Sequence, residues 1–137
     1  MSASPRHSAA GRGARLMALG QGWFWLVSGL WPIVHLGSFM AVTGPKTDTW
    51  LVQTVGGLLA VIGAGLLLAA RRGNVSAEVR FIAAASALVL VAIDVIFVLR
   101  DVIAPIYLAD AAVELAIAVG WWVVRPRSNA EPEVRAR

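Results

Sequence analysis

Four long apolar segments, separated by short polar stretches, dominate the pattern of this sequence. They run from Leu16 to about Val42, from Trp50 to Ala70, from Val79 to Leu99 and from Ile106 to Val124. Each approaches the roughly 20 residues that a helix needs to cross about 30 Å of hydrocarbon. Because only helices and closed barrels can cross lipid, continuous apolar runs of this length predict four transmembrane helices, over about 16–42, 50–70, 79–99 and 106–124.

The connections between these segments are short, and they determine the expected topology. They read TGPKTDT, RRGNVSAE and RDVIAP. Short loops make neighbouring helices antiparallel, so the sequence predicts an all-α fold: a transmembrane four-helix bundle, up-down-up-down, over residues 16–124. The flanking residues 1–15 and 125–137 are polar, and we expect both to be disordered tails. The first apolar segment is longer than the apolar core of a signal peptide, so we interpret it as a retained span, with cleavage as the lesser alternative.

Composition supports a membrane protein and excludes several chemistries. Of the 137 residues, 58% are hydrophobic and 15% are charged, whereas soluble domains have about 45–50% apolar and about 25% charged residues. The sequence holds no cysteine, which removes disulfides and thiolate chemistry. With His7 in a polar tail and His35 as the second histidine, a haem with two histidine ligands is not expected. We predict neither a cofactor nor a metal.

Arginine and lysine are unevenly distributed, and they predict an orientation. Ten of the twelve basic residues fall in the two tails and the second loop, and Lys46 and Arg100 fall on the other side. The positive-inside rule then places both termini in the cytoplasm. The net charge of +4 is thereby explained by topology, so nucleic acid is not an expected partner. The excess of Arg over Lys, with abundant Ala, Val and Gly, suggests a GC-rich bacterial genome, so we expect a multi-pass protein of a bacterial inner membrane. The same orientation predicts where the tryptophans at the membrane interfaces lie. Trp50 should lie near the outer surface, and the others near the inner surface: Trp23, Trp25, Trp121 and Trp122.

Ionisable residues inside the apolar segments concentrate in the half of the membrane away from the cytoplasm. At about 1.5 Å per residue, His35, Asp94, Asp110 and Glu114 lie roughly 6–12 Å inside the outer ends of their helices. A carboxylate near a helix centre costs about 2.5–3.5 kcal/mol on insertion scales. We therefore expect these acids to face the bundle interior and either to pair with His35 and nearby cations or to hold protons.

These positions lead to the hypothesis of an outward-facing acidic pocket inside the membrane, which binds protons or a small cationic or amphiphilic ligand. A salt-bridge cluster that fixes helix register is the structural alternative. A metal site has little support, because no Glu-x-x-His repeat is present. The expected ligand- or proton-binding residues are His35, Gln53, Asp94, Asp110 and Glu114, and the expected mouth residues are Lys46, Asp48, Arg100 and Asp101.

Other functions stay open from the sequence alone. They are a non-catalytic accessory subunit, a small transporter, and a membrane isomerase that uses the carboxylates as general acid and base. We rank the non-enzymatic functions above the enzymatic one and assign no catalytic residue. The expected partners are the lipid bilayer and a small amphiphile, and a second copy of the chain or a membrane complex is compatible with the pattern.

Local signals predict how the helices bend and pack. Pro32 removes a backbone hydrogen bond and should kink the first helix beside His35. Asp48 or Thr49 is expected to cap the second helix. Small residues in that helix predict close helix packing, either within the bundle or between copies: Gly56, Gly57, Ala60, Gly63, Ala64, Gly65 and Ala69.

Two stretches, SGLWPIVHLGSFMAVTGPKTDTWLVQTVGGLLAVIG and VIFVLRDVIAPIYLADAAVELAIAV, resemble a set of small four-span bacterial membrane proteins. The resemblance covers about Gly22 to Trp122, and its most distinctive part is VTGPKTD-W-LV, from Val42 to Val52. It implies the fold predicted above and brings no activity with it. The shape is also similar, more loosely, to DoxX-like and EXPERA-type bundles, the latter of which bind or isomerise sterol-like amphiphiles with acidic residues in a membrane pocket. No site residue is carried over from either group.

Overall fold

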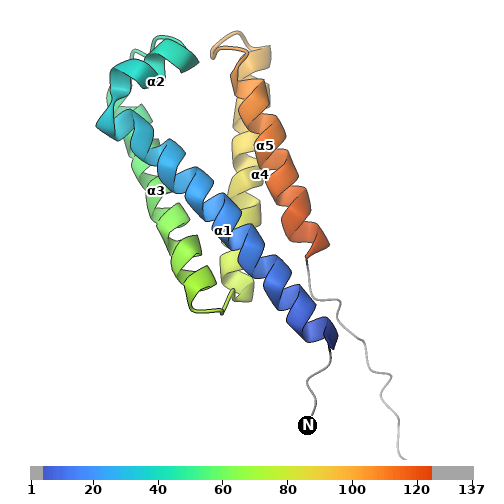
Figure 1. The fold of residues 1–137 in the computed structure, drawn as a ribbon. Helices are drawn as coiled ribbons and strands as arrows, with labels where there is room; N and C mark the ends of the chain where they lie inside the picture. Colours follow the sequence, from blue (N-terminus) through green and yellow to red (C-terminus); the bar gives the residue numbers. More distant parts are fainter. Residues whose placement is uncertain (1–4, 125–137) are drawn as a thin grey trace, which may run out of the picture.

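Five helices make up the part of the chain that the structure describes, residues 5–124 of a computed structural model (Figure 1). No strand occurs among these residues, so the all-α prediction is confirmed for them. The expected segments 50–70, 79–99 and 106–124 agree with the last three helices to within two residues. The expected tail 125–137 lies outside the described residues. The helices are α1 (Pro5–Val34), α2 (Leu36–Thr43), α3 (Thr49–Arg71), α4 (Ala77–Leu99) and α5 (Tyr107–Val123).

The first segment differs most from its prediction. Helix α1 begins at Pro5, so residues 5–15, which we expected to lie in a disordered tail, are helical over most of their length. Tertiary packing accounts for the helix just before residue 16, because Ala14 is 2% exposed and belongs to a core cluster that also contains Leu66 and Trp121. The polar and small residues of this stretch give no indication in the sequence that Ala14 makes a core contact.

The chain then breaks at His35 instead of continuing to Val42. Helix α2 follows after this single residue and is bent from α1 by 111°. His35 leaves the helical conformation at φ −147° and ψ 75°, and its Nδ1 accepts a hydrogen bond from the backbone N–H of Ser38 at 3.1 Å. His35 therefore acts as the N-cap of α2, and the bend that we predicted at Pro32 lies three residues further along.

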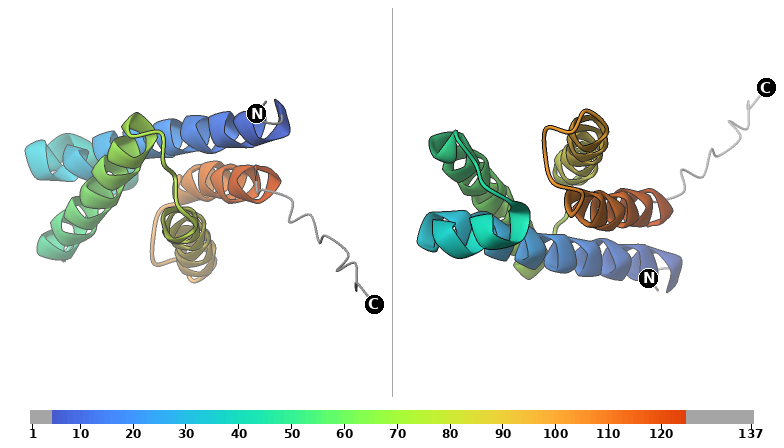
Figure 2. Two further views of the ribbon diagram at one scale, coloured as in Figure 1. Left: turned by 90° about the horizontal axis from the view of Figure 1, so that it is seen from below. Right: turned by 90° about the horizontal axis from the view of Figure 1, so that it is seen from above.

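The helices form two antiparallel pairs. Helix α1 packs along α3, and α4 packs along α5, while the contacts between the pairs are fewer (Figures 1 and 2). Close approach within the first pair depends on glycine: a Cβ added at Gly63 would lie 2.7 Å from the carbonyl oxygen of Gly22. The predicted small-residue packing is thus an α1–α3 contact. Gly65, by contrast, has nothing within 4 Å of an added Cβ.

Gln21 joins the two pairs near the end where the chain starts. Its side chain is 2% exposed and belongs to α1. Nε2 donates to the carbonyl oxygen of Ala83 in α4 at 2.9 Å, and Oε1 accepts from Nε1 of Trp121 in α5 at 2.6 Å. One buried amide thereby uses both of its ends to hold three helices together. Trp121, which we expected at the membrane interface, lies in this core.

Two of the helices are long and apolar enough to cross a membrane, namely α3 and α4. A third candidate span is formed by residues 11–34 of α1 together with α2, if this bent pair is counted as one membrane-crossing segment. Helix α5 has 17 residues. Among the described residues the structure therefore supports a membrane protein.

Candidate functional site

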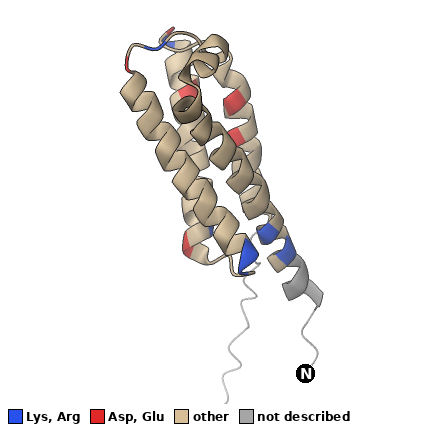
Figure 3. Cartoon of the chain, turned by 60° about the vertical axis from the view of Figure 1, so that its left-hand side comes forward, with Lys and Arg blue, Asp and Glu red and all other residues tan. Residues whose placement is uncertain are grey.

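Three carboxylic acids converge between α4 and α5, and we name them the acid cluster: Asp94, Asp110 and Glu114. Asp94 belongs to α4 and is 5% exposed, whereas Glu114 belongs to α5 and is 1% exposed. Asp110 lies one helical turn before Glu114 and is half-buried. Figure 3 shows acidic positions along the helices in the upper half of the bundle, while most basic positions lie at its lower end. The structure thus brings together the three acids that the sequence placed in the same half of the bundle.

Asp94 and Asp110 are close enough for their side chains to interact directly. Their carboxyl groups lie within hydrogen-bonding reach of each other. An ionised carboxylate has only acceptors, so a hydrogen bond between two carboxyl groups requires one proton. The second oxygen of Asp94, Oδ2, is buried and has no hydrogen-bond partner among the described residues. A hydrogen bond between these two side chains would therefore need a proton on one of them.

Glu114 is held by an aromatic donor from the other helix pair. Trp25 in α1 is fully buried, and its Nε1 donates to Glu114 Oε1 at 2.6 Å. The other oxygen, Oε2, is buried without a hydrogen-bond partner in the described structure. We expected Trp25 at the inner membrane interface. It lies instead in the bundle interior, because α1 is rotated so that this side chain reaches Glu114 in α5.

A short series of polar groups links the acid cluster to the loops at the upper end. Tyr107 in the first turn of α5 lies within hydrogen-bonding reach of the Thr43 side chain, which ends α2 and is 8% exposed. Tyr107 also interacts electrostatically with Asp94 and Asp110. Lys46 lies above the Tyr107 ring, with Nζ 5.1 Å from its centroid. These contacts lead from the loop after α2 to the acids.

Lys46 is held in place by the backbone of its own loop. Its Nζ donates to the carbonyl oxygens of Thr43 at 2.7 Å and Gly44 at 3.3 Å. Partial burial lowers the pKa of Lys46. Lys46 thus lies at the loop end of the polar series, and its role at the mouth of the pocket stays a prediction.

The remaining predicted site residues lie on exposed surface. His35 caps α2, and Gln53 is exposed on α3 near its start. Asp48 precedes α3 as its N-cap residue, without a side-chain cap hydrogen bond. Arg100 and Asp101 follow α4, and Asp101 has a positive φ of 56°. Their predicted roles in binding stay predictions.

Metal and pocket geometry give two further observations. Among the residues that the structure describes, no group of three or more His, Cys, Asp or Glu side chains is arranged to hold a metal ion. A groove of about 770 Å³ lies between α4 and α5, but at the end of the bundle opposite the acid cluster. Asp94 and Glu114, by contrast, are enclosed by neighbouring side chains, with exposures of 5% and 1%.

The expected binding residues left out three members of the site, namely Trp25, Tyr107 and Thr43. The helical period does place Tyr107 on the face of Asp110 and Glu114, but it did not indicate a role for its hydroxyl group. Thr43 and Trp25 carried no signal in the sequence, since their contacts are made across the bundle by residues far apart in the chain.

Comparisons with protein-family models, curated proteins and solved structures found no match for this chain.

Proposed function

We propose that this chain is a multi-pass protein of a bacterial inner membrane that binds protons at the acid cluster, which faces the side away from the cytoplasm. A small cation competing for the same carboxyl groups is the related alternative. The observation that carries the proposal is the convergence of three carboxyl groups, two of whose oxygens, Asp94 Oδ2 and Glu114 Oε2, are buried without a hydrogen-bond partner among the described residues. A carboxyl group in this setting is more stable in its protonated, neutral form, because a buried charge without a partner is costly.

The proposal includes four spans with both termini in the cytoplasm. Residues 16–34 of α1 would extend about 29 Å, which is enough for the hydrocarbon core without α2. Helix α5, at 17 residues, meets the lower limit of about 17 residues for a span. Helix α2 would then lie across the outer end. The charge asymmetry supports this orientation, since the basic residues of the tails and second loop are Arg6, Arg12, Arg15, Arg71, Arg72, Arg80, Arg125, Arg127, Arg135 and Arg137.

Access for protons would follow the polar groups at the upper end. Tyr107 and Thr43 provide hydroxyl groups between the outer loops and the Asp94–Asp110 pair. Hydroxyl groups both donate and accept, so they can pass a proton along. The lower half of the bundle offers no equivalent series among the residues described, because its buried polar side chain, Gln21, is hydrogen-bonded at both ends.

A structural role is the second function that an observation favours. The Trp25–Glu114 hydrogen bond joins the two helix pairs, and an accessory subunit would need the acids only for this purpose. The two functions differ in one measurable property, since a purely structural cluster does not exchange protons while the protein stays folded.

The test is an infrared titration of the folded protein in lipid vesicles. Protonated carboxylic acids have a carbonyl stretch separate from that of carboxylates, and we expect such a band to appear or vanish reversibly with pH. The band should be lost or altered in Asp94→Asn and unchanged in Asp101→Asn, because Asp101 is exposed on the loop after α4. A wild-type spectrum with no reversible carboxylic band, or an identical response in both variants, would overturn the proposal.

A further inference from the structure

The ammonium group of Lys46 has surroundings that would suit a free monovalent cation. Its Nζ donates to the carbonyl oxygen of Thr43 at 2.7 Å and to that of Gly44 at 3.3 Å. The same nitrogen lies over the Tyr107 ring, 5.1 Å from the centroid. Proteins bind potassium ions with carbonyl oxygens, and they bind ammonium groups over the faces of aromatic rings. Lys46 Nζ therefore fills a position whose ligands fit a small cation.

The backbone of the loop after α2 fixes these ligands. Gly44 has a φ of 87°, in the left-handed region that glycine adopts without strain. A Cβ added at Gly44 would lie 3.7 Å from the Cβ of Ala104, so this loop lies in contact with the segment that precedes α5. Tyr107 begins α5 three residues later. The two carbonyl oxygens and the ring thus come from two loops that pack together at the same end of the bundle.

This position lies at the loop end of the polar series that leads to the acid cluster. Tyr107, whose ring faces Nζ, lies within hydrogen-bonding reach of the Thr43 side chain and interacts electrostatically with Asp94 and Asp110. A proton can pass between hydroxyl groups along hydrogen bonds, because each hydroxyl both donates and accepts. A metal cation needs ligands at each point of its path, and here Lys46 already occupies them. Like charges also repel each other, which disfavours a second cation beside the ammonium group.

We propose that Lys46 is a built-in cation that makes the acid cluster selective for protons, by occupying the carbonyl and aromatic ligands that potassium or sodium would need at the loop end of the polar series. The inference rests on the proposed binding of protons at the acid cluster, and it names the residue that excludes a competing cation. When the amine is removed, the same ligands become open to potassium.

The experiment is the infrared titration of the full chain in lipid vesicles, carried out on the parent and on Lys46→Ala in N-methylglucamine chloride and in potassium chloride at equal ionic strength. In N-methylglucamine the carboxylic band of Lys46→Ala should titrate at a higher pH than that of the parent, because loss of a positive charge favours the protonated acid. We expect a difference of roughly half a pH unit, less than the 1–3 units that a charge in contact gives, since Tyr107 lies between.

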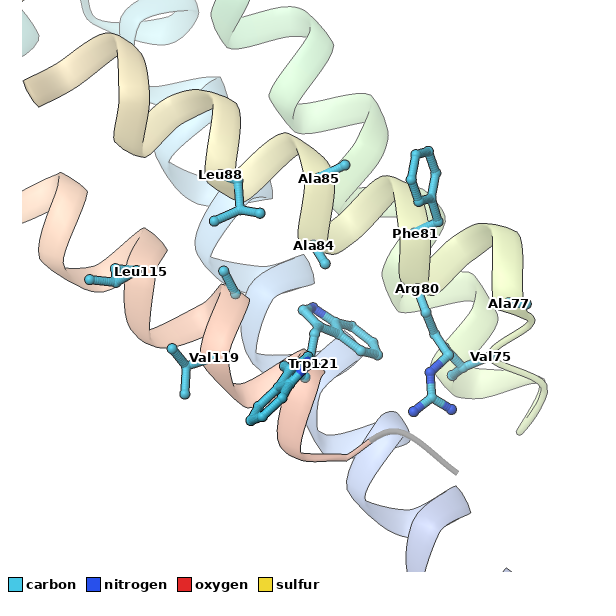
Figure 4. Close-up of a pocket in the computed structure, with 12 residues that line it drawn as sticks. Val75, Ala77, Arg80, Phe81, Ala84, Ala85, Leu88, Leu115, Val119 and Trp121 are labelled. Atoms are coloured by element: carbon cyan, nitrogen blue, oxygen red, sulfur yellow. The ribbon is translucent and has the colours of Figure 1, made fainter. Parts of the chain in front are cut away.

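Potassium should then distinguish the variant from the parent. It should lower the midpoint of Lys46→Ala towards that of the parent, because bound potassium replaces the missing charge. The parent should titrate alike in both salts. Arg100→Met is the matched control, since Arg100 is exposed after α4 and its loss leaves the ligands of Lys46 in place. Ala84→Leu, in the groove at the opposite end of the bundle, should also titrate alike in both salts (Figure 4).

A second measurement covers the chance that Lys46→Ala disturbs the loop. Methylammonium carries the group that the substitution removes, so it should restore the midpoint of the parent if the ligands stay in place. The proposal is overturned if potassium fails to lower the midpoint where methylammonium succeeds, if neither cation lowers it, or if Arg100→Met responds to potassium as Lys46→Ala does. A parent without a reversible carboxylic band would instead contradict proton binding at the acid cluster itself, so the two failures are distinguishable.

Discussion

The hydrogen bond between Trp25 and Glu114 can be tested by a substitution that removes one hydrogen-bond donor and little else. Trp25→Phe keeps an aromatic ring in the core but deletes the Nε1–H group that donates to Glu114 Oε1 at 2.6 Å. Glu114 is 1% exposed, and within the described part of the chain its other oxygen has no hydrogen-bond partner. The variant would therefore leave a buried carboxyl group with neither oxygen satisfied, and we expect the bundle to lose stability.

The magnitude follows from burial and from the membrane setting. Interhelical hydrogen bonds in membrane proteins average about 0.6 kcal/mol and reach about 1.7 kcal/mol. This one is short, fully buried and made to a carboxyl group, so we place it near the upper value. The smaller ring also leaves a void around a side chain that is 0% exposed, which adds a cavity penalty. Together these effects predict a loss of roughly 2 kcal/mol in the free energy of unfolding.

The assay is reversible unfolding in mixed micelles, followed by circular dichroism as the fraction of denaturing detergent rises. Trp31→Phe serves as the control, because Trp31 also donates through Nε1, to Ser38 Oγ at 2.8 Å, but is 38% exposed. Loss of an exposed donor is compensated by solvent, so the control should change stability by no more than about 0.5 kcal/mol.

A double variant separates the hydrogen bond from the packing. When Glu114→Leu is combined with Trp25→Phe, the unpaired polar group is removed, and the pair should lose less stability than the sum of the two single variants. If Trp25→Phe costs no more than Trp31→Phe, or if the two single effects simply add, the Trp25–Glu114 hydrogen bond does not join the helix pairs as we describe.

Three further predictions concern packing, the buried amide and pH. Gly63→Ala should lose about 1–3 kcal/mol in the same unfolding assay, because its Cβ would meet the Gly22 carbonyl at 2.7 Å. Gln21→Leu should lose about 2 kcal/mol, since it removes the acceptor of the Trp121 Nε1–H group and the hydrogen bond from α1 to the Ala83 carbonyl. In the pH range where the unfolded chain has released the proton of the Asp94–Asp110 pair and the folded chain still holds it, the free energy of unfolding should fall as pH rises. The expected decrease is up to about 1.4 kcal/mol per pH unit.

Each of these predictions has a control within the chain. Gly65→Ala should be neutral or slightly stabilising, because nothing lies within 4 Å of its added Cβ. Gln53→Leu, at an exposed position, should not weaken the bundle as Gln21→Leu does. Asp94→Asn should reduce the dependence on pH, while buried Glu114 keeps its own contribution. Equal losses in the two glycine variants or in the two glutamine variants would contradict the packing described here, and a pH dependence that is the same in the parent and in Asp94→Asn would contradict the shared proton.

The sequence alone determined where three of the long helices lie and which half of the bundle holds the acids. Both results follow from local properties: apolar runs of about 20 residues favour helices in lipid, and a rise of about 1.5 Å per residue converts position into depth. The side-chain period of the helix likewise placed Asp110 and Glu114 on one face. None of these inferences needs knowledge of a partner helix.

The tertiary structure decided how the first helix extends and ends, and which groups meet the acids. Helicity from Pro5 reflects packing of Ala14 in the core, and the 111° bend depends on His35 capping α2. Trp25 reaches Glu114 across 89 positions of the chain. Contacts of this kind depend on the rotation and tilt of whole helices, which result from many small packing interactions and leave no periodic trace in the sequence.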